Sequence, residues 1–225
     1  TYVGHPVLLS GAERGDGAAF RQSHHIAADT PVLVVLPGSR TGECARMLPV
    51  FSKTVTRLVE RFPALEVVVP TLPQTQTQAE AALRKLKVPL HFVSGDAAKF
   101  DAFAAADAAL AASGTVALEL AMAGTPTVIG YRVALVTSLL AKVLLKTPFV
   151  NLVNILLGRE AIPEFLMERC RDDAMAEALE ALLADATVRA AQKQAYTDAL
   201  GALGFGEIDP NRRAAEAVLG VMARP

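Results

Sequence analysis

The sequence has few cysteines and little net charge, and both absences narrow the class of protein. Its two cysteines, Cys44 and Cys170, lie far apart and form no CxxC or Cys/His pattern. This argues against a structural zinc site and indicates free thiols in a reducing cytoplasm. The net charge of −1 over 225 residues provides no bulk attraction to nucleic acid. Because the sequence also shows no carboxylate cluster suited to a metal and no Ser/His/Asp or Cys/His arrangement, we predict no metal and no cofactor.

The sequence also lacks a long uninterrupted hydrophobic run. Residues 133–157 are the most apolar stretch, but Lys142, Lys146, Pro148 and two asparagines interrupt it, which excludes a membrane span. Residues 134–146 are predicted to form an apolar helix with both lysines on one side, suited either to contact with a membrane surface or to packing in the domain or a dimer. Because the chain opens on Thr1 and not on Met, we expect it to be a piece of a longer protein.

What the chain does have is a regular alternation of apolar runs and amphipathic stretches, with 52% hydrophobic residues and a mean hydropathy of +0.34. Strands are predicted at 31–36, 65–69, 90–93, 108–111 and 127–130, and helices at 46–62, 74–86, 96–105, 134–146, 172–184, 188–203 and 210–222. Residues 10–30 are predicted to form a polar, glycine-rich loop. The pattern is typical of an α/β fold in which helices cover both faces of a Rossmann-like parallel sheet. We divide the chain into an entry segment and loop (1–30), the sheet domain (31–170) and C-terminal helices (171–225).

The most informative motif is the turn from the strand 108–111 into a helix. Ser113, Gly114 and Thr115 are small residues at the start of that helix, and Glu119 follows one turn after Thr115. Such a turn leaves backbone N–H groups free for a phosphate, and Glu119 is placed about 9 Å from Ser113 along the helix, near enough for a ribose hydroxyl. A plain helix start with a surface glutamate is the alternative.

A second motif ends the strand 31–36. Gly38 lets a backbone approach closely, Ser39 follows it, and Arg40 brings a planar charge suited to phosphate. Ligands of open parallel sheets bind beyond the carboxyl ends of the strands, so this motif and the Ser113 turn are expected to face one crevice. A turn with a solvated arginine is the alternative.

A third cluster places polar groups in the apolar stretch 151–160. The amide of Asn154 can donate and accept at once, as recognition of a uracil edge or a sugar hydroxyl requires. An asparagine that closes a loop is the alternative, and Arg159 and Glu160 can equally form a surface ion pair.

Taken together, the motifs resemble the C-terminal part of lipid-A-disaccharide synthases, a family of bacterial glycosyltransferases. The resemblance runs in order from Tyr2 to about residue 170. It is carried by Val3-Gly4-His5-Pro6, Leu36-Pro37-Gly38-Ser39-Arg40, Ala112-Ser113-Gly114-Thr115 with Leu118-Glu119, Gly130-Tyr131-Arg132, Asn154-Ile155-Leu156 and Gly158-Arg159-Glu160. Two positions depart from the family pattern, because Val153 stands where a proline is usual and Cys44 where an aliphatic residue is usual.

The resemblance implies the C-terminal, donor-binding half of a GT-B fold. It also implies metal-independent, inverting transfer of 2,3-diacylglucosamine from its UDP derivative to 2,3-diacylglucosamine 1-phosphate. Arg40 and the amides of Ser113, Gly114 and Thr115 would hold the pyrophosphate, Glu119 the ribose, and Asn154 would lie near the uridine or the sugar. We count Arg40 and Glu119 as catalytic, expect the general base in an N-terminal domain, and add further substrate-binding residues: Gly38, Ser39, Tyr131, Arg132, Arg159 and Glu160.

The same resemblance predicts a cytoplasmic enzyme on the inner-membrane surface, with a possible homodimer through the C-terminal helices. The alternatives are another GT-B enzyme that uses a UDP-sugar, either the transferase acting on the peptidoglycan lipid intermediate or a UDP-N-acetylglucosamine epimerase, and a nucleotide-binding fragment without catalytic activity.

Overall fold

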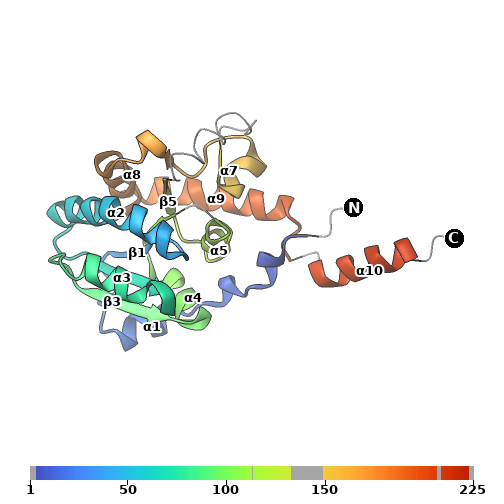
Figure 1. Cartoon of the computed structure of the whole chain (residues 1–225), viewed down its shortest axis with the longest axis horizontal. Coiled ribbons are helices and arrows are strands. Elements are labelled where there is room, and N and C mark those ends of the chain that lie inside the picture. Colours follow the sequence, from blue (N-terminus) through green and yellow to red (C-terminus); the bar gives the residue numbers. More distant parts are fainter. Residues whose placement is uncertain (1–3, 113, 133–148, 207–208, 223–225) are drawn as a thin grey trace.

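A six-stranded parallel sheet forms the centre of the chain (Figure 1). The structure is a computed structural model and describes residues 4–112, 114–132, 149–206 and 209–222. The strands follow the spatial order β3-β2-β1-β4-β5-β6. Their bounds are β1 Val32–Leu36, β2 Glu66–Thr71, β3 Leu90–Ser94, β4 Ala108–Ala111, β5 Thr127–Tyr131 and β6 Glu164–Leu166. The strand order reverses between β1 and β4, so the crevice at their carboxyl ends is where a ligand is expected.

The central strands β1 and β4 are apolar throughout and are buried on both faces of the sheet. In β1, Val32, Val34 and Leu36 belong to one hydrophobic core, whereas Leu33 and Val35 belong to the core on the other face. This follows from the alternation of side chains along a strand. Burial of each aliphatic side chain stabilises the fold by about 1.5–3 kcal/mol. An uninterrupted apolar run is therefore more stable at the centre of the sheet than at an exposed edge.

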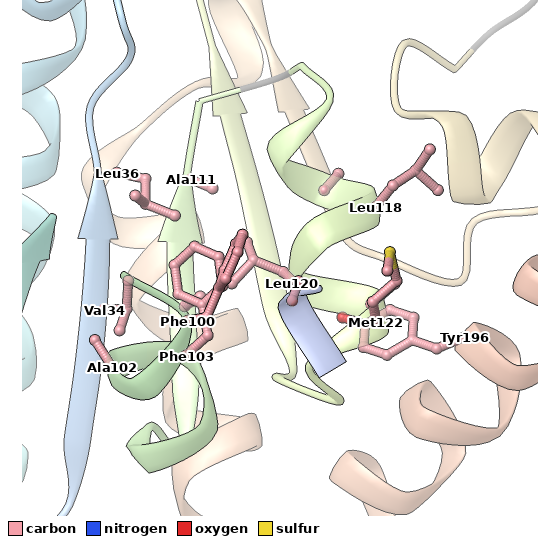
Figure 2. Packing of buried hydrophobic residues seen from close by; sticks show 14 of the residues in the cluster. Val34, Leu36, Phe100, Ala102, Phe103, Ala111, Leu118, Leu120, Met122 and Tyr196 are labelled. Atoms are coloured by element: carbon pink, nitrogen blue, oxygen red, sulfur yellow. The ribbon is translucent and has the colours of Figure 1, made fainter. Parts of the chain in front are cut away.

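Helices cover the two faces in separate groups. One face packs against α2 Thr41–Arg61, α3 Pro73–Leu83 and α8 Asp172–Ala184. The other face packs against α1 Gly17–Ser23, α4 Asp96–Ala105, α5 Val116–Met122, α7 Leu152–Leu157 and α9 Ala186–Ala202. Figure 2 shows the second core from close by, with Phe100 and Phe103 of α4 between the strands and Leu120 of α5. The core fixes α4 and α5 on the same face of the sheet.

The expected loop at residues 10–30 is wrong, because this segment contains helices. The 3-10 helices η1 Pro6–Leu9 and η2 Ala12–Arg14 precede α1. Asp16 caps α1 by accepting from the Ala19 N–H at 2.9 Å, and Phe20 is buried. Arg21 then fixes the segment to the sheet domain, since its guanidinium donates to the Ala105 carbonyl at 2.7 Å and to Asp107 at 3.0 Å. These partners are more than eighty residues away, so the local composition does not reveal the helix.

The second half of the chain adds elements that the apolar pattern did not predict. The strand β6 and the helix α7 lie within the stretch 149–170, and the 3-10 helix η3 Met167–Arg169 follows β6. The helices α8 and α10 Pro210–Met222 match the predicted bounds, and α9 differs from its predicted bounds by two residues at its start and one at its end. In Figure 1, α10 extends away from the sheet beside the N-terminal segment, and its Val218 and Leu219 are exposed. The predicted helix 134–146 lies outside the described residues.

Candidate nucleotide-sugar site

A cavity of about 280 Å³ opens at the carboxyl ends of β1, β2, β3 and β4. It is lined by Leu36, Gly38, Ser39, Glu43, Pro70, Thr71, Leu72, Val93, Ser94, Gly95, Asp96, Lys99, Ala112, Gly114, Thr115, Val116 and Glu119. The first two motifs of the sequence are therefore brought to one place, as predicted from their position at strand ends. The cavity lies at the switch point of the sheet, where open parallel sheets bind their ligands.

The loop between β1 and α2 forms one wall of the cavity. Gly38 has a φ of +122°, and a Cβ there would come within 2.3 Å of the Glu43 carboxylate. The Ser39 N–H donates to this same carboxylate at 2.9 Å, and Glu43 is 7% exposed. Glycine is required at position 38 because the backbone approaches a side chain of α2 there, and not only because a ligand needs room.

Arg40 lies at the end of this loop, directly before α2, and does not belong to the cavity lining. Its side chain is exposed, and its carbonyl accepts from the Glu43 and Cys44 N–H groups at 3.0 and 2.9 Å, which begins α2 at Thr41, five residues before the predicted start. The side chain of Arg40 therefore has no part in holding the helix start, and it is available to a ligand.

Tyr131 and Arg132 lie where β5 ends, beside the same loop. Burial raises the pKa of the Tyr131 hydroxyl and the nearby Glu43 carboxylate raises it further, while Arg46 and Arg40 lower it. Arg132 donates to the Cys170 carbonyl and its own carbonyl accepts from the Arg46 side chain. Neither Tyr131 nor Arg132 belongs to the cavity lining given above, so a contact of either with a substrate stays a prediction.

The start of α5 forms the opposite wall. Gly114 has a φ of +155°, Thr115 stands at the N-cap position without a side-chain hydrogen bond to the helix, and both line the cavity. Ser113, which the sequence analysis placed beside them, lies outside the described residues. Glu119 also lines the cavity, one turn into α5, with 16% of its side chain exposed. Glu119 and Thr115 thus line the same cavity, and a contact of Glu119 with a ribose stays a prediction.

Lys99 is a cavity residue that the sequence analysis missed. Its Nζ lies 3.2 Å from both carboxylate oxygens of Glu119 and 2.9 Å from Asp96 Oδ1. The side chain also lies over the Phe100 ring, with Nζ 4.5 Å from the ring centroid. The only local signal was the three-residue spacing of Asp96 and Lys99 directly after a predicted strand. The contact with Glu119 joins α4 to α5 and cannot be read from spacing.

The third cluster is separate from the cavity, and its side chains bind backbone. Asn154 is fully buried, its Nδ2 donates to the Ile162 carbonyl at 2.7 Å, and its Oδ1 accepts from the Ala161 and Ile162 N–H groups at 2.8 Å each. This is the loop-closing role that the sequence left open, and a contact with uridine or sugar stays a prediction. Arg159 and Glu160 are exposed, and Glu160 accepts from the Glu164 N–H at 3.1 Å.

Glu164 of β6 is the charged residue at the centre of this cluster. It is 3% exposed and accepts from the Asn151 N–H at 2.5 Å and the Val150 N–H at 3.2 Å. Burial raises the pKa of the Glu164 carboxyl, against the effect of these donors. Asn151 in turn caps α7 by accepting from the Val153 N–H at 2.8 Å. A single glutamate in an apolar stretch carries no spacing signal, so the role of Glu164 could not be read from the sequence.

Neither a metal site nor a membrane span is found in the part of the chain that the structure describes. Within those residues no group of three or more His, Cys, Asp or Glu side chains is arranged to hold a metal ion. No helix there combines the length and the apolar character that crossing a membrane requires.

Solved structures define the class of the fold. The chain superimposes on WaaG, a glycosyltransferase involved in lipopolysaccharide biosynthesis, with a TM-score of 0.61 at 18% identity over 93% of this chain and 53% of that one. It also superimposes on the glycosyltransferase CalG4 with a TM-score of 0.53 at 20% identity, over 88% of this chain and 44% of that one. The fold is thus a Rossmann-like half of the GT-B type.

The sequence assigns the chain within that class. The model of the lipid-A-disaccharide synthetase family matches residues 1–218, and the chain belongs to this family. Lipid-A-disaccharide synthase of Rhodospirillum centenum is 48% identical over 224 residues, which cover 100% of this chain and 56% of that protein. The enzyme of Paramagnetospirillum magneticum is 49% identical over 220 residues, or 97% of this chain and 56% of that protein. The chain therefore spans about half the length of these relatives.

Proposed function

We propose that the chain is the donor-binding part of a lipid-A-disaccharide synthase. The whole enzyme would transfer 2,3-diacylglucosamine from its UDP derivative to the 6-hydroxyl of 2,3-diacylglucosamine 1-phosphate, releasing UDP and a β-1,6-linked disaccharide phosphate. The observation that carries the proposal is the cavity at the switch point of the sheet, with Gly38, Ser39, Thr115 and Glu119 in its walls. The chain that contains this cavity belongs to the lipid-A-disaccharide synthetase family.

The residues around the cavity suggest how the departing UDP would be stabilised. Breaking the sugar–phosphate bond places negative charge on the diphosphate, and preorganised N–H donors and a guanidinium lower the energy of that charge. We assign this role to Arg40 and to the backbone from Ser113 to Thr115, and we assign the ribose hydroxyls to Glu119. The proton of the attacking hydroxyl would go to a base outside this chain, so we expect the 225-residue chain alone to bind UDP without transferring sugar.

Two further parts of the proposal concern where the enzyme works and with whom. Both substrates are lipids, so the enzyme would act at the cytoplasmic face of the inner membrane without crossing it. The C-terminal helix α10 exposes Val218 and Leu219 at 60% and 63%, and apolar side chains on an extended helix favour contact with another chain or another domain. We therefore propose that a homodimer would form through the C-terminal helices.

The assignment of Glu119 provides the sharpest test of the donor site. Glu119→Gln keeps one acceptor and loses the charge, while Glu119→Ala loses both. UDP affinity is expected to fall in the order wild type, Gln, Ala. Loss of a charged hydrogen bond costs about 1.5–3 kcal/mol, so the Ala variant should bind UDP roughly 10- to 150-fold more weakly. Calorimetric titration of the 225-residue chain measures this directly.

Inorganic pyrophosphate is the internal control, because it has no ribose and its binding should not weaken in either variant. Glu177→Ala, on the exposed surface of α8, is the matched control for loss of one carboxylate. If the Glu119→Ala variant binds UDP as tightly as wild type, or loses pyrophosphate equally, Glu119 is not the ribose ligand. Absence of UDP binding by the wild-type chain would contradict the donor-site proposal as a whole.

A further inference from the structure

Lys99 connects the two helices that form the inner wall of the cavity. Of its neighbours, Asp96 and Phe100 are on α4 with Lys99 itself, whereas Glu119 is on α5. The lysine side chain is 21% exposed and lines the cavity. A rotation of this side chain would break its contact with α5.

The position of the ammonium on Glu119 is the first observation that matters. Nζ is 3.2 Å from Oε1 and 3.2 Å from Oε2, so it lies on the edge that the two oxygens share. A carboxylate only accepts hydrogen bonds, and a vicinal diol binds it by donating one O–H to each oxygen across that same edge. A ribose and Lys99 therefore compete for one edge of Glu119.

The charge of the cavity is the second observation. The lining contains three carboxylates, Glu43, Asp96 and Glu119, and Lys99 is the single cation among the described residues of the lining. A diphosphate that enters this space meets an excess of negative charge, which is unfavourable in a partly desolvated site. Lys99 is the lining group that can offset the charge.

We propose that Lys99 is a ligand-exchanging residue, which occupies the diol-binding edge of Glu119 in the empty site and turns to the diphosphate when a nucleoside diphosphate binds. This inference rests on the proposed function and adds a residue to it. The four-carbon stem of lysine allows the ammonium to move by several ångströms. The exchange leaves each carboxylate oxygen of Glu119 free for one ribose hydroxyl and places a cation beside the phosphates.

The test compares two ligands that differ only in the diphosphate, UDP and uridine, by titration of the 225-residue chain. In Lys99→Met, UDP should bind at least about 10-fold more weakly, because a charged contact is lost. Uridine should bind as well as to wild type or more tightly, because no lysine has to leave Glu119. Lys85→Met, on the exposed surface after α3, removes the same charge elsewhere and should change neither affinity.

Equal weakening of UDP and uridine in Lys99→Met would overturn the inference, because Lys99 would then only hold Glu119 in place. Unchanged binding of both ligands would overturn it as well. Lys99→Arg keeps the charge and should retain UDP affinity within a few-fold of wild type; if Lys99→Met does not fold, Lys99→Gln takes its place in the comparison. Failure of wild type to bind either ligand would instead overturn the proposed function and this inference with it.

Discussion

Two polar clusters of this chain look alike in sequence and differ in what their side chains bind. At the carboxyl ends of β1 to β4, Lys99 and Glu119 bind each other beside a cavity. Between α7 and β6, Asn154 and Glu164 bind backbone groups of their own segment. A side chain that bonds to another side chain can exchange its partner at little cost, whereas one that satisfies buried backbone cannot leave without orphaning it.

The comparison separates residues that hold the fold from residues that are available to a ligand. A glutamate stands in each cluster, Glu119 in one and Glu164 in the other, so the residue type alone does not identify the purpose. The bonded partner identifies the purpose. Substitutions in the cluster between α7 and β6 should therefore change stability, and substitutions beside the cavity should change ligand binding or turnover.

The largest effect is expected for Asn154→Ala. The change leaves the Ala161 and Ile162 N–H groups and the Ile162 carbonyl without their buried partner. Each orphaned group costs about 1–3 kcal/mol, so the free energy of unfolding should fall by about 3 kcal/mol or more. Chemical denaturation of the wild-type and variant chains measures this loss.

Asn211→Ala, the same change at an exposed position of α10, should leave the stability within about 0.5 kcal/mol of wild type. UDP affinity per folded molecule should stay unchanged in Asn154→Ala if the residue only closes the loop. An additional fall in that affinity would mean that Asn154 also contacts the nucleotide, as the family resemblance implies. The two clusters would then both contribute to ligand binding.

The opposite outcome is expected for Arg40→Ala in the full-length enzyme. Removing a donor to developing charge typically lowers the rate by about 10²–10³, while the helix start depends on the Arg40 carbonyl, which the variant keeps. Turnover should therefore fall strongly with little change in melting temperature. Kinetics and thermal melting on the same preparations check both.

Arg171→Ala is the matched control, because Arg171 stands at the N-cap position of α8 with the same extended backbone conformation. In the hydrogen bonds of the described structure its side chain pairs only with the partly exposed Asp173. Arg171→Ala should keep the wild-type rate and should lose at most about 1 kcal/mol of stability. A large loss of melting temperature in Arg40→Ala with an unchanged rate per folded molecule would place Arg40 with the fold-holding residues.

The sheet and the cavity wall could be predicted because their signals are local. Short, mostly apolar runs marked β1 to β5, and the four-residue spacing of Thr115 and Glu119 placed both on one face of α5. Helical geometry places Glu119 beside Thr115 once the helix is known, and both line the cavity, whereas the role of Glu119 toward a ribose stays a prediction.

The rest could not be predicted because it depends on contacts between distant parts of the chain. The ion pair of Lys99 and Glu119 spans twenty residues, and the helix α1 is held by Arg21 against Ala105 and Asp107. The role of Asn154 depends on which groups the fold brings to its amide, and its local sequence was equally consistent with a ligand contact.

The smallest effect concerns Glu164 and the pH dependence of stability. Burial raises the pKa of this carboxyl above its ordinary value of 4.5. A folded pKa above the unfolded value means that the contribution of Glu164 to stability is complete below about pH 4.5 and is lost as the pH rises through the folded pKa. Glu164→Gln cannot titrate, so the stability of wild type relative to this variant should decrease over that interval. Chemical denaturation of both proteins at several pH values from 4 to about 8 measures the difference.

Other carboxyls complicate the raw curve but not the difference. Arg57 and Arg171 lower the pKa values of Asp172 and Asp173, and such groups contribute stability that is lost as the pH falls, with the opposite sign. They are present in wild type and in Glu164→Gln alike, so they cancel when the two are subtracted. Glu177→Gln makes the same chemical change on the exposed surface of α8 and is the matched control. If the curve for Glu164→Gln is flat, the N–H donors balance the effect of burial on this carboxyl, and if it rises with pH they outweigh it; either result contradicts the prediction. In the second case the N–H donors between α7 and β6 would stabilise the ionised form of Glu164, much as Lys99 pairs with the carboxylate of Glu119 beside the cavity.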